Sequence, residues 1–508
     1  MMKGKAFQWS AAEAAASDAV AQWAADGPGG AIVGFDRDGL RFAVSGGLAD
    51  LNHGLPFTPD TVSRCASVTK HLLCAMVLSH PEAIALDDPL GAHLPELAPA
   101  LAEVTVARAL SMTGGLADTR ESLSLLGLSS AAPSEAGTLM AYHARMTGLN
   151  FAAGSEVSYS NAGYRLVEEA LKRRGLTLVG FVAEAINGPL GTRFAVPEHW
   201  GDPVLGLAPG YWHDGAQWQP GGQGMHLSAA GSLAASATDM ARWVAALLAG
   251  QGVLSGLWDG MSAQRSLSDG TETPYGLGLY RVPLGDHVLI GHSGAQAGYR
   301  AQFLTLPEAG VGVVVLSNRD DVKALSLVLA TFAALLEAPM PVPVAPGTLP
   351  TGLYVEADGP RWVEVKATSL VHMGTEEALY DGGEGWAESC SGTAPMRLRW
   401  TGAALEGSIG HAPCRLLPVG EAPLPEGLEG HWHMPEEGAV FEIRDGMVHW
   451  GIGPSRRAAP LTPLGTGRAL FLMADGPARR PVCLVKTGAD SLTLGLNRAR
   501  AVPYVRLR

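Results

Sequence analysis

The chain is poor in cysteine, and its cysteines do not form a recognisable pattern. There are five of them, at positions Cys65, Cys74, Cys390, Cys414 and Cys483. None has the Cys-x-x-Cys or Cys/His spacing of a zinc or redox site, so we expect reduced thiols and no metal. Reduced thiols are typical of a cytosolic protein.

Basic charge and long apolar runs are also lacking. The chain has 36 Lys and Arg against 49 Asp and Glu, a formal net charge of −13. Nucleic acids and anionic membranes bind basic surfaces, so neither is an expected partner. No window approaches the ~18 apolar residues of a membrane span, and the closest segment, 324–336, is predicted to be a core helix. Glu13 and Asp18 interrupt the Ala-rich N-terminus, which indicates an amphipathic surface helix over residues 1–26 rather than a signal peptide. A cytoplasmic location is expected.

The 508 residues are 47% hydrophobic and 17% charged, which predicts an ordinary globular chain of two to four domains. Segments 31–35 and 40–44 flank Asp-Arg-Asp-Gly, a hairpin pattern. After a helical middle, four more strands are predicted, at 275–280, 287–290, 301–306 and 311–316. Strands from both ends around a helical centre predict an α+β domain with one antiparallel sheet and a helical subdomain.

A proline-rich spacer marks the clearest boundary. It contains Pro339, Pro341, Pro343, Pro346 and Pro350. Beyond it, short β-rich runs alternate with turns, which predicts all-β modules. The predicted organisation is a first domain over 1–337, a linker over 338–350, and two antiparallel β-barrels over 351–422 and 423–508.

Ser67 and Lys70 carry the most informative chemistry in the chain. They are three residues apart at the head of an apolar helical run, so they share one face of a helix. A hydroxyl becomes a nucleophile when a nearby base takes its proton, and a desolvated lysine can be that base. The alternative is an N-capping serine followed by a solvated lysine. The chain has seven lysines, and Lys70 is the only one in a Ser-x-x-Lys pattern.

Two further triplets lie in the first domain. Tyr159-Ser160-Asn161 precedes an apolar helix, and His292-Ser293-Gly294 lies between two predicted strands. Each triplet alone is common. Indeed His372-Met373-Gly374 repeats the His-x-Gly pattern in the second half, where we predict a turn.

In this order the three motifs resemble those of the serine β-lactamase and penicillin-binding protein superfamily: Ser-x-x-Lys, Tyr-x-Asn and Lys/His-x-Gly. Residues 106–116 and 231–240 also resemble characteristic stretches of that superfamily, as does the run 275–318. Ala153 and Met112 depart from it, since proline and histidine are usual there. The resemblance implies a penicillin-recognising catalytic domain.

The resemblance also implies roles for the motif residues. Ser67 would form an acyl-enzyme while Lys70 and Tyr159 share the proton transfers, and the sequence leaves open which of the two is the base. Asn161 would bind the substrate amide or hold Lys70. The backbone N–H groups of Ser67 and Ala295, the latter following Gly294, would form an oxyanion hole. No cofactor is implied.

His292 occupies a position where many relatives have lysine. A histidine near pH 7 is neutral or partly charged, so the site should tolerate substrates without a terminal carboxylate, such as amides and esters; the alternative is a structural histidine. Together with two C-terminal β modules, this resembles the D-aminopeptidase family. There a loop of the last module reaches the cleft, which implies 471–478 as that loop and Asp475 as a partner for the substrate amine. The alternative for Asp475 is an ordinary Asp-Gly hairpin turn.

The expected function is that of a serine hydrolase that releases small N-terminal D-residues, such as D-Ala or glycine-like residues, from peptides, amides and esters. A homodimer is a family-based expectation. Three alternatives remain open: a broad carboxylesterase of the same fold, a D,D-peptidase, and an inactive binding or sensor protein.

Overall fold

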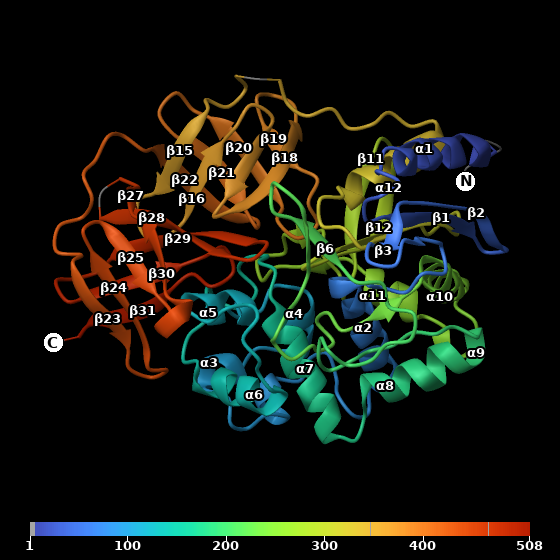
Figure 1. Cartoon of the computed structure of the whole chain (residues 1–508), viewed down its shortest axis with the longest axis horizontal. Coiled ribbons are helices and arrows are strands. Elements are labelled where there is room, and N and C mark those ends of the chain that lie inside the picture. Colours follow the sequence, from blue (N-terminus) through green and yellow to red (C-terminus); the bar gives the residue numbers. More distant parts are fainter. Residues whose placement is uncertain (1–5, 346, 466, 508) are drawn as a thin grey trace.

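The computed structural model describes residues 6–345, 347–465 and 467–507. The first five residues of the expected N-terminal helix, and Pro346 of the expected linker, therefore lie outside the described residues. The chain folds into a mixed domain of helices and one large sheet, followed by two antiparallel β structures (Figure 1). The expected fold class is thereby confirmed.

The central sheet joins the two ends of the first domain. It has six antiparallel strands in the order β11-β12-β13-β14-β1-β2, and β1 pairs with β14 so that Gly30 lies opposite Ser317. The strands are β1 (Gly30–Asp36), β2 (Gly39–Gly46), β11 (Tyr280–Leu284), β12 (His287–Gln296), β13 (Tyr299–Leu306) and β14 (Val311–Ser317). The expected strand at 275–280 is wrong, because this edge strand starts at Tyr280.

Helices cover both faces of this sheet (Figure 1). α1 (Trp9–Ala21) and α12 (Ala324–Leu336) pack together on one face, while α10 (Ala237–Ala249) packs on the other. α12 has the bounds predicted from its apolar composition. The remaining helices are α2 (Lys70–Ser79), α3 (Pro99–Ala102), α4 (Val106–Leu110), α5 (Thr119–Leu125), α6 (Ala136–Arg145), α7 (Asn161–Arg173), α8 (Leu178–Phe181), α9 (Gly188–Leu190) and α11 (Leu257–Ser262).

Short strand pairs brace the loops between these elements. They are β3 (Leu48–Asp50) with β4 (Leu55–Pro56), β5 (Ser63–Arg64) with β8 (Ala234–Ala235), β6 (Tyr211–His213) with β7 (Trp218–Pro220), and β9 (Arg265–Ser266) with β10 (Glu272–Thr273). The β5–β8 pair matters most for the site, because the chain leaves β5 directly into the turn that carries Ser67.

Beyond α12 the chain forms a closed eight-stranded barrel with its own apolar core. Its strands are β15 (Gly352–Glu356), β16 (Trp362–Val365), β17 (Ser369–His372), β18 (Thr375–Asp381), β19 (Ala387–Ser389), β20 (Met396–Trp400), β21 (Leu405–Ile409) and β22 (Ala412–Pro418). His372 ends β17 and Met373-Gly374 makes the turn to β18, so the second His-x-Gly pattern is a turn as predicted.

The last structure is a nine-stranded antiparallel sheet that curls almost into a barrel. Its strands are β23 (Gly430–Met434), β24 (Ala439–Arg444), β25 (Met447–Trp450), β26 (Arg457–Pro460), β27 (Thr462–Pro463), β28 (Arg468–Asp475), β29 (Ala478–Lys486), β30 (Ser491–Gly495) and β31 (Val502–Arg506). Figure 1 shows the nine-stranded sheet beside α5 and the eight-stranded barrel above that sheet, toward β11.

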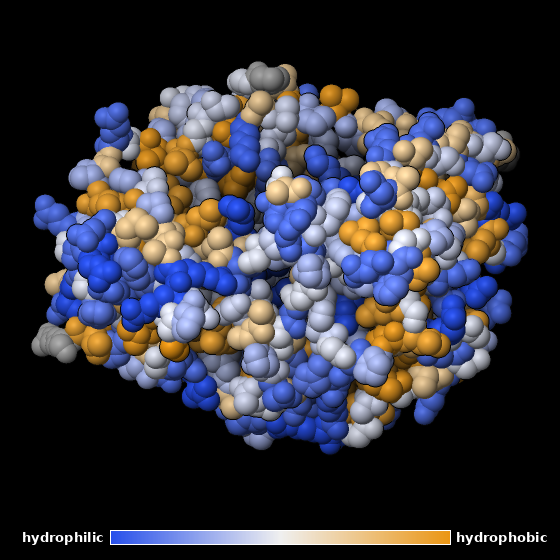
Figure 2. All heavy atoms as spheres, in the orientation of Figure 1, coloured by the Kyte–Doolittle hydropathy of each residue, from blue (hydrophilic) through white to orange (hydrophobic). Residues whose placement is uncertain are grey.

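On the face shown in Figure 2, hydrophobic side chains occur in small groups separated by hydrophilic ones. Within the described residues, no single helix has both the length and the apolar composition to cross a membrane. α10 and the stretch Gly252–Ser262 meet those criteria only as a pair bent by 76°.

Candidate active site

Ser67 lies on a tight turn that two neighbours hold in place. The turn is a 3-10 helix, Ala66–Thr69, that leads into α2, so Ser67 and Lys70 straddle a junction rather than sharing one α-helix. Ala66 has a φ of +49°, a left-handed conformation uncommon for a residue with a side chain. The Thr69 hydroxyl donates to the Ala66 carbonyl (2.6 Å) and accepts from the Leu233 N–H (2.9 Å). Ser67 itself stays half-exposed.

The Lys70 amine is completely buried and faces three oxygens. Its Nζ is 3.0 Å from Ser67 Oγ, 2.8 Å from Asn161 Oδ1 and 2.6 Å from the Ala230 carbonyl oxygen. Burial lowers the pKa of Lys70 well below its usual value. The nearby Asp118 carboxylate opposes this shift, and the positive charges of Arg498 and Arg120 add to it.

Only one of these three oxygens can give up a proton. The Ala230 carbonyl is an acceptor, and Asn161 Oδ1 is fixed as an acceptor because Asn161 Nδ2 donates to Asp118 Oδ2 (2.6 Å). A neutral amine has two N–H groups, which satisfy these two acceptors. Its lone pair is then left for the Ser67 hydroxyl, the geometry required for activation of an alcohol.

Tyr159 lies beside this pair, at the start of α7. The Lys70 Nζ is 4.8 Å from the centre of its ring. Burial raises the pKa of Tyr159, which keeps the phenol protonated; the Ser67 side chain and the Arg498 charge oppose that shift. The Tyr159 hydroxyl is buried and makes no hydrogen bond of normal geometry with the described residues. It is therefore a donor in need of an acceptor.

Asp118, which the sequence did not single out, orients Asn161. Its Oδ2 accepts from the backbone N–H (2.9 Å) and side-chain amide of Asn161, and its Oδ1 caps α5 through the N–H groups of Arg120 and Glu121. Burial opposes its ionisation, but Arg498 and these N–H groups lower the pKa of Asp118 overall. The sequence did contain a signal that could have identified Asp118: it stands three residues before Glu121, a pattern typical of a helix N-terminus.

Gly294 brings the edge of the sheet against the nucleophile. A Cβ at this position would lie 2.1 Å from the Cys65 carbonyl oxygen, so only glycine lets the strand approach so closely. β11 pairs with β12 only as far as Gly291, which leaves the following residues at the sheet edge. Ala295 is exposed there and lines the same cavity as Ser67.

His292 is buried behind the site rather than facing it. Its Nε2 lies 2.8 Å from the Tyr275 hydroxyl and its Nδ1 lies 2.6 Å from the Ser293 carbonyl oxygen, so both ring nitrogens have partners. Burial lowers the pKa of His292 well below its usual value, and the Lys70 charge is the second largest cause of this shift. His292 is therefore neutral, as the sequence suggested, but it is not among the described residues that line the Ser67 cavity.

The cavity at Ser67 is small, about 30 Å³. Besides Ser67, Asn161 and Ala295, it is lined by Arg120, Arg165 and Gln296 among others. Gln296 is 7% exposed and its Nε2 donates to the Gly231 carbonyl (2.8 Å), while its Oε1 is buried without a partner among the described residues. Buried acceptors are normally satisfied, so this oxygen is free for a substrate donor. No cluster of His, Cys, Asp or Glu suited to a metal occurs in the described part of the chain.

A loop of the last sheet does reach the site, but it is the segment 496–501 and not 471–478. The Arg498 carbonyl accepts from the Asp118 N–H (2.8 Å), and the Arg498 N–H donates to Glu121 (2.6 Å). The segment 471–478 is instead the β28–β29 hairpin. There Asp475 accepts from the Ser129 hydroxyl (2.9 Å), the Ser130 N–H and Arg457 (2.7 Å), and it is not among the described residues lining the Ser67 cavity.

A buried carboxylate joins three parts of the chain next to Tyr159. Glu156 binds Arg361 from the eight-stranded barrel (3.0 Å) and Arg500 from the 496–501 loop (2.9 and 2.6 Å). All three side chains are at most 10% exposed. The junction fixes the approach of both C-terminal structures to the backbone that carries the tyrosine.

The sequence profile described as Beta-lactamase matches residues 15–337 of this chain. The chain belongs to the β-lactamase family. It is 30% identical to a D-aminopeptidase of Brucella anthropi over 308 residues, which are 58% of this chain and 56% of that relative's length. It is also 27% identical to a D-aminopeptidase of Cereibacter sphaeroides over 95% of this chain and 96% of that one.

The solved structure of the octameric penicillin-binding protein homologue from Pyrococcus abyssi has the same fold. It aligns over 94% of this chain and 96% of its own, with 17% identity and a TM-score of 0.54. The resemblance to D-aminopeptidases expected from the motifs is confirmed by these comparisons. The homodimer expected from the family stays a prediction.

Proposed function

We propose that this β-lactamase family member is a D-stereospecific aminopeptidase that releases small N-terminal D-residues from peptides, amides and esters through an acyl-enzyme on Ser67. The observation that carries the proposal is the buried Lys70 amine, whose three partners include one ionisable alcohol, Ser67. The D-stereospecificity is supported by the D-aminopeptidases that the chain resembles, one of them along nearly the whole length of both proteins.

The directions of the pKa shifts assign the proton transfers. Lys70, held neutral by burial, takes the Ser67 proton as Oγ attacks the carbonyl carbon. Tyr159, kept protonated, donates to the leaving nitrogen or oxygen as the tetrahedral intermediate collapses, and it regains its proton from Lys70. Water then attacks the ester with Lys70 again the base, the acid leaves, and Lys70 returns the proton to Ser67 Oγ. The N–H groups of Ser67 and Ala295 stabilise the oxyanion.

The substrate amine has a different partner from the one first expected. The Asp475 carboxylate already binds Ser129, Ser130 and Arg457, so it serves to anchor a loop. Gln296 Oε1 is instead an unsatisfied acceptor in the cavity at Ser67, and we assign the α-amino group to it. The neutral His292 supplies no fixed positive charge, in keeping with a site that tolerates substrates without a terminal carboxylate.

Kinetics with D-alanine and L-alanine p-nitroanilides, a p-nitrophenyl ester and a chromogenic cephalosporin test the proposal. We expect turnover of the D-anilide and little of the L form. Equal rates for the two enantiomers, or ester cleavage alone, would identify the broad esterase instead. The Ser67→Ala variant should be inactive with a nearly unchanged melting temperature, and intact-mass spectra of the wild type should show an adduct on Ser67. Absence of acylation by every reagent would indicate a binding protein.

A further inference from the structure

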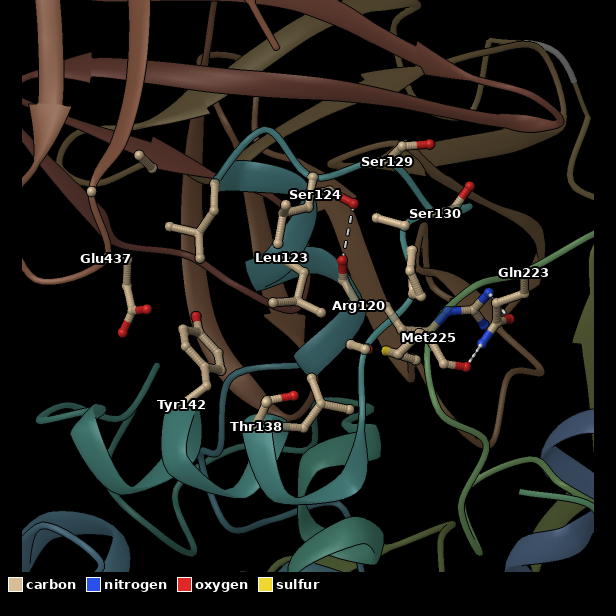
Figure 3. A pocket seen from close by; sticks show the side chains of 18 of the residues that line it. Arg120, Leu123, Ser124, Ser129, Ser130, Thr138, Tyr142, Gln223, Met225 and Glu437 are labelled. Carbon is tan, nitrogen blue, oxygen red and sulfur yellow. Dashed lines mark hydrogen bonds between the residues drawn. The ribbon is translucent and has the colours of Figure 1, made fainter. Parts of the chain in front are cut away.

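A second cavity, of about 370 Å³, adjoins the cavity at Ser67. It lies between the α5–α6 region of the catalytic domain and three places on the last sheet: the β23–β24 turn, Ile452 and Arg480. Figure 3 shows Arg120, Gln223 and Met225 gathered at one side of it, and Tyr142 and Glu437 at the other. Its volume is in the range that accommodates small organic ligands.

The two cavities are neighbours that share part of their walls. Arg120, Gln223 and Met225 line both of them. A molecule with its carbonyl at Ser67 can therefore extend into the larger space. Since the Ser67 cavity offers only about 30 Å³, the larger cavity is a neighbouring space that can take the rest of a substrate.

Much of the lining is apolar and some of it is open to solvent. Leu123 and Leu139 form part of the wall, and Ile452 and Leu128, which also line the cavity, are 89% and 48% exposed. Large aliphatic side chains at such a site gain by contact with an apolar group of a ligand.

The charges of the cavity are unbalanced at the end near Ser67. At the far end, Arg145 is neutralised by a two-pronged ion pair with Glu437 (2.9 and 2.8 Å). Arg120 donates to the amide oxygen of Gln223 (3.0 Å), and Arg480 has no carboxylate partner among the described residues. Burial, and second the charge of Arg480, lowers the pKa of Arg120, so the two guanidinium groups are close enough to repel each other. Asp118 opposes this shift, and the Arg480 charge also acts on the buried Glu121 carboxyl, but neither guanidinium makes an ion pair with a carboxylate among the described residues. Two neighbouring guanidinium groups without such a pair favour an anion.

We propose that this cavity is the leaving-group subsite of a peptide substrate, in which an apolar residue packs near Ile452 while its free carboxylate binds Arg480 and Arg120. The inference rests on the proposed function and names the substrate class: short peptides, with an apolar C-terminal residue after the scissile bond, rather than simple amides. In the reaction, the peptide nitrogen leaves with a proton from Tyr159, and the released amino acid occupies the cavity.

The test compares D-Ala-L-Leu with D-Ala-L-leucinamide and D-alanine p-nitroanilide. The wild type should cleave the acid with a kcat/KM about tenfold above that of the leucinamide. Arg480→Gln should remove that preference through a rise in KM for the acid, with kcat and the anilide reaction unchanged. Arg479→Gln is the matched control, because Arg479 is exposed and points to the opposite face of the same strand. Equal rates for acid and leucinamide, or equal effects of the two substitutions, would overturn the subsite.

The proposed contact between the apolar residue of the substrate and Ile452 is tested separately. Ile452→Ser should lower the preference for D-Ala-L-Leu over D-Ala-Gly about threefold or more without unfolding the protein, because Ile452 is exposed. Val440→Ser, at a half-exposed position outside the cavity, should leave that preference unchanged. An unchanged Leu/Gly ratio in Ile452→Ser contradicts the proposed packing.

Binding to the inactive Ser67→Ala variant separates the two proposals. Calorimetric titration with D-Ala-L-Leu and with its leucinamide should show tighter binding of the acid, lost in Ser67→Ala/Arg480→Gln. If neither peptide nor anilide is cleaved by the wild type but this difference persists, the proposed function fails and the cavity is only a binding site for a peptide carboxylate. If the anilide is cleaved and the two ligands bind alike, the subsite fails alone.

Discussion

The guanidinium of Arg498 lies over the ring of Tyr159, with its Cζ 4.7 Å from the ring centre. The Lys70 Nζ is 4.8 Å from the centre of the same ring. A residue of the 496–501 loop in the last sheet thus contributes a positive charge to the catalytic pair in the first domain. That charge helps to lower the pKa of Lys70 and counteracts the rise in the pKa of Tyr159.

Replacing Arg498 by alanine should lower activity without unfolding the protein. A partly buried cation–π contact is worth about 1–2 kcal/mol, so kcat/KM should fall about tenfold. The acid limb of its pH profile should also move to higher pH, because Lys70 would lose a charge that lowers its pKa. Arg397→Ala, which removes a guanidinium 4.2 Å from the Trp386 ring far from the site, is the control. A tenfold loss with an unmoved acid limb would contradict the electrostatic role.

Asp118 should be essential for orienting Asn161. Asp118→Ala removes the acceptor of Asn161 Nδ2 and the cap of α5, so we expect a loss of kcat of about a hundredfold or more and a decrease in the free energy of unfolding of about 3 kcal/mol. Asp118→Asn can still cap the helix but cannot accept from both N–H groups of Asn161. It should regain most of the stability and little of the activity, as measured by urea unfolding and initial rates. Normal kcat in both variants would exclude the role.

His71 makes stability depend on pH. Burial lowers its pKa from 6.5 to about 4, and its Nε2 accepts from Trp243 Nε1 (2.7 Å). Between these two pKa values the unfolded chain binds a proton that the folded chain does not. The free energy of unfolding should therefore decrease as pH falls from 6.5 to 4, by about 3 kcal/mol for this group. Urea unfolding at several pH values should show a shallower slope for His71→Gln; an identical slope would assign the effect to other groups.

Glu156 should be the costliest single carboxylate to neutralise. Glu156→Gln leaves the Arg361 and Arg500 guanidinium groups buried beside a neutral amide, which we expect to lower the free energy of unfolding by about 3–5 kcal/mol. Glu388→Gln breaks the exposed pair with Arg397 (2.6 Å) and should cost about 1 kcal/mol or less. Similar losses in the two variants, in chemical denaturation, would show that the junction contributes little.

Local sequence patterns predicted the elements whose partners lie nearby. The hairpin of β1 and β2, the helix α12 and the strands β13 and β14 follow from apolar runs and turn residues. The segment 275–279 misled because its backbone binds helices instead of joining the sheet: the Leu277 N–H donates to the Met261 carbonyl of α11 (2.8 Å). Gly278, with a φ of +65°, lies against the first turn of α2, where a Cβ on Gly278 would be 2.8 Å from the His71 Cα. That contact joins segments some 200 residues apart and leaves no trace in the local pattern.

The motif residues Ser67, Lys70, Asn161 and Tyr159 do lie together in the structure. They could be predicted because each belongs to a short motif that is recognisable in the sequence alone. The loop from the last sheet could not be identified in this way. The Asp475 hairpin and the segment with Arg498 are both turns between strands, and their sequences look alike as turns. Both reach the catalytic domain, and which of them lies beside Tyr159 depends on how the last sheet curls, which is set by pairing between distant strands.

The pairing of Gly30 with Ser317 also has a consequence for synthesis. At about 5–20 residues per second, the ribosome needs on the order of 15–60 s to make the 287 residues between them. During that interval the β1–β2 hairpin is a two-stranded ribbon with an open edge, which is marginally stable by itself and prone to wrong pairing. Until β14 has been synthesised, the nascent chain therefore exposes an unpaired strand edge along β1.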